Sequence, residues 1–196
     1  MKLRAFLLVP LFAALASAGV IENVREAIAK RGEAATLQEL DSYRKSQGVT
    51  AEYLEAYSWL ARAEYNAHRY AEATKYADDV YDLCVKELKK RPIDQEKHLP
   101  IAIGAAIEVQ AGTMAAQGRR AEAVSLLQDA LKKFAGTSIQ TRTQKNLLLL
   151  TLEGKPAPAL EGVALPKGKP AIVFFWAHWC PDCKAEAPIL KRVLDE

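Results

Sequence analysis

Cysteine is scarce in this chain, with three residues in 196, and this scarcity restricts the kinds of site that it can build. Cys180 and Cys183 form a C-x-x-C pair, whereas Cys84 is distant in the sequence. A structural zinc site needs four ligands, so the pair could supply only part of one, even with His178 nearby. Dithiol chemistry is therefore favoured over a zinc site at this pair.

The chain also lacks a large excess of either charge. Its formal net charge is +3, and Lys2 and Arg4 supply two of these charges in a segment that we expect to be removed. The basic clusters at 86–91 and 132–133 are typical of solvated helix ends, where cations meet the C-terminal end of the helix dipole. The charge balance thus argues against nucleic acid as a partner.

The apolar stretch near the N-terminus, residues 5–16, falls short of the ~20 residues that a membrane span needs. It follows Lys2 and Arg4 and ends in Ala16-Ser17-Ala18, a small-x-small cleavage pattern. We predict a signal peptide over residues 1–18 and a secreted or periplasmic protein with no stable membrane span after cleavage. The alternative is an N-terminal membrane anchor.

Residues 19–153 are predicted to form a helical domain, because their apolar residues recur every three or four positions. Hydrophobic residues make up 50% of the chain and charged residues 26%, which is typical of a soluble globular protein. Thr50 is a predicted N-cap. The expected helices cover residues 20–30, 34–45, 51–67, 70–89, about 103–114, about 123–134 and 138–152.

Two of the expected helix pairs resemble each other. The residues after the first turn, 69–73, read R-Y-A-E-A, and those after the second, 119–123, read R-R-A-E-A. This pattern resembles the tetratricopeptide helix hairpin, but the spacing of 50 residues departs from the usual repeat of about 34. The alternative is a plain antiparallel helical bundle.

The composition changes after residue 153. Residues 154–158, G-K-P-A-P, cannot continue a helix and are predicted to be a linker. Residues 160–165 and 171–177 are predicted strands, and a helix is expected from Lys184 onward. Cys180 and Cys183 then fall on the turn between strand and helix. Unpaired N–H groups and the helix dipole at that position favour a thiolate at Cys180, so we expect it to be the nucleophile.

The run W-A-x-W-C-P-x-C-K at 176–184 resembles the active-site signature of the thioredoxin superfamily, and C-K-x-E-x-P at 183–188 resembles its secreted TlpA-like reductases. The resemblance implies that Cys180 attacks a disulfide and that Cys183 resolves the mixed disulfide. Trp179 and Pro188 match the tryptophan and the helix proline of that signature. Pro181 lies in the dipeptide that tunes the potential, and Lys184 adds a cation near the pair.

Glu186 matches an acid that TlpA-like members carry after the second cysteine, and it is the candidate for proton transfer. Many cytosolic thioredoxins instead have a buried aspartate at the position of Phe174. The resemblance implies a redox-active Cys180–Cys183 disulfide, with no other cofactor and no metal.

The resemblance covers about the last fifth of the chain. A thioredoxin-like domain needs on the order of 100 residues, so we expect residues 159–196 to be the N-terminal part of a truncated domain. The predicted fold class is mainly α, with antiparallel hairpins followed by an incomplete α/β fragment of one or two strands and the active-site helix.

Two features of the helical domain leave alternatives open. Cys84 shares the apolar face of its helix and is predicted to be buried, but an intermolecular or regulatory disulfide is the alternative. Aromatic residues are concentrated in the first hairpin, and most should be core. Trp59 lies off the main apolar stripe and could line a groove for a peptide.

These observations predict an exported thiol–disulfide oxidoreductase that acts on protein thiols and disulfides. The family resemblance favours disulfide reduction over oxidation. The helical domain would hold a peptide or protein partner. The alternative is a helical-repeat binding module whose truncated redox motif is inactive.

We predict that the exported protein begins at Gly19, because Ala16 and Ala18 frame the end of the apolar stretch. Intact-mass measurement of protein recovered from the culture medium or periplasm checks this. A mature protein that still begins at Met1 would instead indicate a membrane anchor.

Overall fold

The computed structural model describes residues 19–157, 159–166 and 168–195, so the predicted signal peptide lies outside it. The contacts between residues divide the chain at Lys155 into a helical unit and a C-terminal unit. The described residues form eight α-helices and one 3-10 helix: α1 (Val20–Lys30), α2 (Glu33–Gln47), α3 (Ala51–Asn66), α4 (Tyr70–Leu88), η1 (Ile93–Gln95), α5 (His98–Ala116), α6 (Arg120–Lys133), α7 (Gln140–Thr151) and α8 (Pro181–Asp195). The mainly α prediction is confirmed, and so are the helices expected in the first 152 residues.

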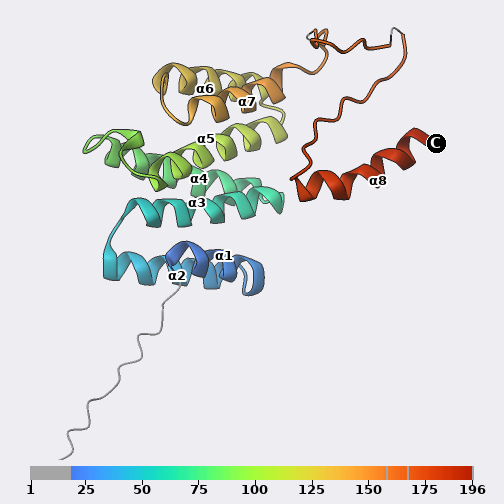
Figure 1. Ribbon diagram of the computed structural model, residues 1–196. Helices are drawn as coiled ribbons and strands as arrows, with labels where there is room; N and C mark the ends of the chain where they lie inside the picture. The colour runs from blue at the N-terminus through green and yellow to red at the C-terminus, as the bar shows by residue number, and fades with distance from the viewer. Residues whose placement is uncertain (1–18, 158, 167, 196) are drawn as a thin grey trace, which may run out of the picture. The chain divides into compact units, whose positions relative to one another are not determined.

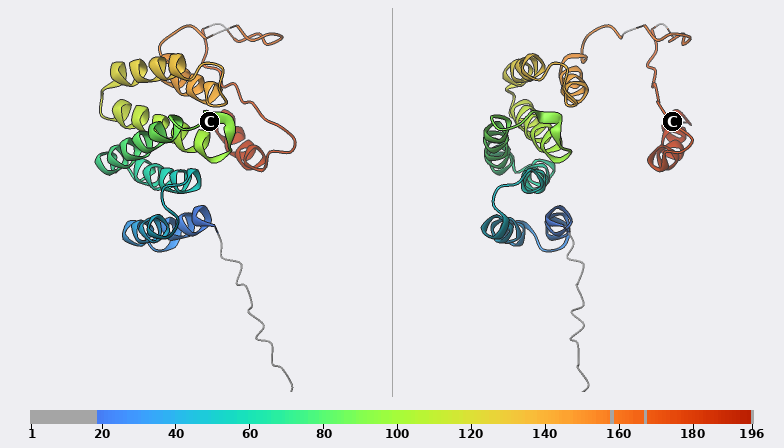
Figure 2. Two further views of the ribbon diagram at one scale, coloured as in Figure 1. Left: turned by 90° about the vertical axis from the view of Figure 1, so that its left-hand side faces the viewer. Right: turned by 60° about the vertical axis from the view of Figure 1, so that its left-hand side comes forward.

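The helical unit is a stack of antiparallel hairpins in two layers (Figure 1 and Figure 2). Helices α1, α3, α5 and α7 form one layer, in which each packs against the next. Helices α2, α4 and α6 form the other layer, and each packs against its hairpin partner. The layer of α1, α3, α5 and α7 therefore provides the continuous contact along the stack.

Residues from the predicted apolar stripes form the core between these layers. In α3, Leu54 and Ala61 are buried, while Tyr57 and Tyr65 are partly buried. In α5, Gly112 allows a close approach, because a Cβ there would lie 2.8 Å from the ring of Tyr65. The other helices bury apolar residues of the same periodic pattern, which are Ala73, Ala77, Val80, Cys84, Ile103, Ile107, Ala111, Ala123, Leu127, Ala130 and Phe134.

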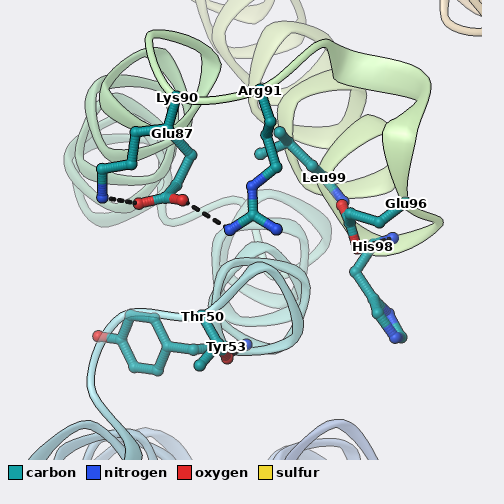
Figure 3. Close-up of polar contacts among 8 residues, drawn as sticks. All are labelled: Thr50, Tyr53, Glu87, Lys90, Arg91, Glu96, His98 and Leu99. Atoms are coloured by element: carbon teal, nitrogen blue, oxygen red, sulfur yellow. Dashed lines mark hydrogen bonds and ion pairs between the residues drawn. The ribbon is translucent and has the colours of Figure 1, made fainter.

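Polar side chains cap the starts of α3 and α5 (Figure 3). The Thr50 hydroxyl accepts a hydrogen bond of 3.1 Å from the Tyr53 N–H, which confirms the predicted cap of α3. The Glu96 carboxylate accepts from the N–H groups of His98 and Leu99 in the first turn of α5. These groups would otherwise lack partners, so both carboxylate and hydroxyl stabilise helix starts.

Helix α5 is long and apolar enough to meet a membrane-span criterion, with a mean hydropathy of 1.3 over an 18-residue window. However, 61% of that window is buried inside the structure. The apolar residues of α5 contact α3, α4, α6 and α7, so α5 is the core helix of the helical unit.

The two hairpin turns that resemble each other in sequence also share their backbone hydrogen bonds. Arg69 N–H donates to the Glu64 carbonyl, and Arg119 N–H, 50 positions later, donates to the Met114 carbonyl. The residue before each arginine has a positive φ, which is +79° at Gly118 and +60° at His68. The left-handed conformation suits glycine and strains a residue with a Cβ. The two turns are therefore similar in backbone geometry as well as in sequence.

The predicted strands at 160–165 and 171–177 are not formed, and no strand occurs among the described residues. The prediction was wrong because a strand needs a neighbour for its N–H and C=O groups. Within residues 171–177, only the Ala177 carbonyl has a recorded backbone partner, the N–H of Cys180. Apolar composition alone therefore did not produce a sheet in the C-terminal unit.

We predict opposite effects of glycine exchange at the two turns. His68→Gly should raise the free energy of unfolding by about 0.5–1 kcal/mol, because it removes left-handed strain. Gly118→Ala should lower it by about 1 kcal/mol for the converse reason. Urea unfolding followed by circular dichroism measures both values. His68→Asn is the control, since asparagine tolerates this conformation, and an unchanged stability in Gly118→Ala would contradict the argument.

Candidate functional site

Cys180 lies at the N-cap of α8, and local hydrogen bonds fix it there. Its carbonyl accepts from the Lys184 N–H at 3.3 Å, which is the first bond of the helix. Its Sγ accepts from the Cys183 N–H at 3.2 Å, as the side chain of a capping residue does. Pro181 is the first helical residue, where its missing N–H costs no intrahelical bond.

The two cysteines form a disulfide, with their Cα atoms 5.3 Å apart. Cys180 precedes the helix and Cys183 is its third residue, so one helical turn brings the sulfurs together. Both residues are partly exposed, which leaves the disulfide accessible from solvent. The N–H group that contacts Cys180 Sγ would also stabilise a negative sulfur after reduction.

The other predicted site residues are placed around this turn without direct bonds to the sulfurs. Trp179 immediately precedes Cys180, and 74% of its surface is exposed. Lys184 and Glu186 are exposed on α8, and no hydrogen bond recorded among the described residues joins either side chain to a cysteine sulfur. Pro188 lies inside α8 and removes the N–H that would bond to the Lys184 carbonyl. The structure therefore brings together Cys180 and Cys183 alone.

Apolar side chains on either side of the cysteines in the sequence are exposed and form no core. Helix α8 has no buried residue, although Ile189, Val193 and Leu194 are large and apolar. Phe175 and Trp176 are 77% and 65% exposed in the segment that leads to the cysteines. The local turn can thus present a disulfide, but the C-terminal unit does not shield it from water.

No group of three or more His, Cys, Asp or Glu side chains suited to a metal occurs in the part of the chain that the structure describes. His178 and Trp179 are exposed, and Ala177 is partly buried.

Cys84 differs from the other two cysteines in its burial and in its free thiol. Its side chain is fully buried on α4 and is a free thiol. Burial, with smaller contributions from Glu87 and Glu96, raises the pKa of Cys84 to about 12. The prediction of a buried cysteine is confirmed, and the raised pKa favours the neutral thiol at physiological pH.

Comparisons with known proteins find similarity over about a fifth of the chain. The soluble secreted antigen MPT53 of Mycobacterium tuberculosis is 51% identical over 43 residues, which cover 22% of each chain. A thioredoxin of Acidithiobacillus ferridurans is 47% identical over 38 residues, 19% of this chain and 35% of the relative. The thiol:disulfide interchange protein DsbE of Pseudomonas aeruginosa is 43% identical over 56 residues, 23% of this chain and 31% of the relative.

These partial similarities support a relationship to the thioredoxin superfamily. The chain spans between about a fifth and about a third of the length of these relatives. No family model matches the chain, and no solved structure gives a significant match.

The sequence did not predict a contact between two arginines and a tryptophan in the helical unit. Arg25 of α1 and Arg62 of α3 both lie against the ring of Trp59. The off-stripe position of Trp59 was the one available signal, since no sequence spacing links α1 to α3.

We predict that the three cysteines fall into two reactivity classes. The oxidised native chain should show no thiol toward an aromatic disulfide reagent at about pH 8, because Cys84 is buried and protonated. Unfolding in urea should expose one thiol per chain. Selective reduction of the native chain should expose two. A reactive thiol in the native oxidised chain would contradict the placement of Cys84.

Proposed function

We propose that this chain carries the thiol–disulfide exchange site of an exported oxidoreductase, with Cys180 as nucleophile and Cys183 as resolving thiol. The observation that carries the proposal is the disulfide at the start of α8, in which the Cys183 N–H donates to Cys180 Sγ. We infer that the matched fifth of the chain is the segment that holds this C-x-x-C pair. The names of two relatives, a thioredoxin and a thiol:disulfide interchange protein, support the same chemistry.

The proposed reaction begins with both cysteines reduced. The Cys180 thiolate attacks one sulfur of a substrate disulfide, which breaks that bond and releases the other sulfur as a thiolate. The Cys183 thiolate then attacks Cys180 Sγ and releases the first substrate sulfur. The substrate gains two electrons and two protons, and the Cys180–Cys183 disulfide forms. An external dithiol donor must return these electrons before another turnover.

Side chains around the turn would tune this reaction. Lys184 adds a positive charge one position after Cys183 and favours the thiolate, whereas Asp182 opposes it by repulsion. Glu186 is one helical turn beyond Cys183, where a carboxylate can pass a proton through a bridging water. Trp179 offers an exposed apolar ring beside Cys180 for the main chain of a substrate.

The finer features of the proposal rest on the sequence. We propose a TlpA-like reductase that is exported after cleavage of residues 1–18, and the name of the secreted mycobacterial relative supports export. Residues 19–153 would be a tetratricopeptide-like domain, joined by a linker at 154–158 to residues 159–196 as part of a thioredoxin-like domain. In this proposal the redox disulfide serves without a further cofactor or metal.

The roles of the two cysteines can be separated with the reduced chain and an aromatic disulfide. The Cys183→Ser variant should release one aromatic thiol per chain and retain the other as a stable mixed disulfide on Cys180. The wild-type chain should release two, because Cys183 displaces the second. Absorbance of the released thiol and intact mass measure both outcomes.

The Cys180→Ser variant is the matched control, since it keeps one cysteine in the same turn. Its reaction should be slower, because the smaller thiolate fraction at Cys183 is only partly offset by greater nucleophilicity. Equal rates in the two variants would contradict the assigned roles. An unreactive pair in the reduced wild-type chain would instead favour a helical binding module with an inactive redox motif.

A further inference from the structure

Helix α7 is the last helix of the helical unit, and it carries apolar residues on its exposed side. Its other side packs against α5 and α6, where Thr143 is buried. Leu148 and Leu149 of α7 and Leu152, which follows its last residue, are all exposed, Leu149 to 65%. Their spacing in a helix places them opposite Thr143. These three leucines, here called the α7 patch, therefore face away from the stack.

The two ends of the layer formed by α1, α3, α5 and α7 differ in polarity. A terminal helix in a stack needs a polar outer face, because no further helix covers it. Helix α1 meets this requirement, since its exposed residues are Glu22, Arg25, Glu26, Ala29 and Lys30. The α7 end instead exposes three leucines close together, which is typical of an interaction surface.

Opposite charges lie at the two ends of the α7 patch. Lys145 is exposed one helical turn before Leu149, and Glu153 directly follows Leu152. Arg120 fixes the position of Glu153, because its guanidinium donates to the Leu150 carbonyl at 2.9 Å and to the Glu153 carboxylate at 2.7 Å. The Glu153 side chain nevertheless remains largely exposed. The patch thus runs from a cation to an anion along the helix.

Such a surface is complementary to itself in the antiparallel direction. With a twofold axis between Leu148 and Leu149, leucines of the two copies meet at the centre of the contact. At each end, Lys145 of one copy then lies one position away from Glu153 of the other, a rise of about 1.5 Å that a lysine side chain spans. A parallel pair would instead place Lys145 against Lys145.

We propose that the α7 patch joins two copies of this chain in an antiparallel dimer. The contact continues the layer of α1, α3, α5 and α7 into the same layer of the second copy, so that α7 gains the outer neighbour that α3 and α5 already have. Three leucines make a small contact, which is typical of a weak and reversible dimer. The proposal concerns the helical unit and does not rest on the proposed redox function.

Sedimentation equilibrium of the exported, oxidised chain over a concentration series tests the dimer. The average mass should rise from that of one chain to that of two, with a Kd below about 500 µM. Leu149→Glu should weaken the dimer by about tenfold or more, because it brings two carboxylates together beside the axis. Circular dichroism during thermal unfolding verifies that this variant keeps the fold.

A charge exchange tests the antiparallel direction. Lys145→Glu and Glu153→Lys should each weaken the dimer by about threefold or more at low salt, because like charges then meet at both ends of the contact. An equimolar mixture of the two variants should dimerise more tightly than either variant alone, since opposite charges then meet at both ends. A defect confined to the fold of one chain would not be rescued by mixing.

Ile189→Glu on α8 is the matched control, because Ile189 is 43% exposed and Leu148 is 41% exposed. This control should leave the Kd unchanged. Loss of the dimer in Ile189→Glu would assign the contact to the C-terminal unit and overturn the proposal. The proposal is also wrong if the chain stays monomeric up to about 500 µM, if folded Leu149→Glu dimerises as the original chain does, or if mixing the charge variants restores nothing.

Discussion

Burial of apolar side chains around the core helix α5 is the constraint on which the structure of residues 19–155 depends. The layer of α1, α3, α5 and α7 places each helix against the next, and its small residues allow close contact. Gly112 receives the ring of Tyr65, and the buried alanines of α3 and α5 leave little separation between backbones. Dispersion and apolar transfer both grow with such contact, and the contacts between the two layers add to those within this layer.

In the C-terminal unit, local hydrogen bonds take the place of apolar burial. Its helix α8 has no buried residue, so hydrogen bonds at the helix start are the main local order around the cysteines. Those bonds nevertheless support the proposed chemistry, because a capping position offers N–H groups to whichever atom occupies it. In this chain that atom is Cys180 Sγ. The buried core and the proposed reactive site thus lie in different segments of the same sequence.

Sequence patterns predicted the helices well because each helix carries its own periodic signal. The helix expected over residues 51–67, its Thr50 cap and the placement of Cys180 at a helix start all follow from residues that are neighbours along the chain. The strand predicted at 171–177 failed for the opposite reason, since a strand is completed by hydrogen bonds to another segment. The contacts of Arg25 and Arg62 with Trp59 were signalled in advance only by the position of Trp59 off the main apolar stripe, because Arg25 reaches the ring from another helix.

The central claim is that apolar burial stabilises the helical unit, whereas the redox turn is held by local hydrogen bonds. Amide hydrogen exchange of the oxidised full-length chain, resolved by mass spectrometry of peptic fragments, tests it most directly. The account predicts that amides of α3 and α5 exchange slowest, because opening them exposes the core, and that amides of residues 171–177 and α8 exchange fastest. Protection of α8 equal to that of α5 would contradict it.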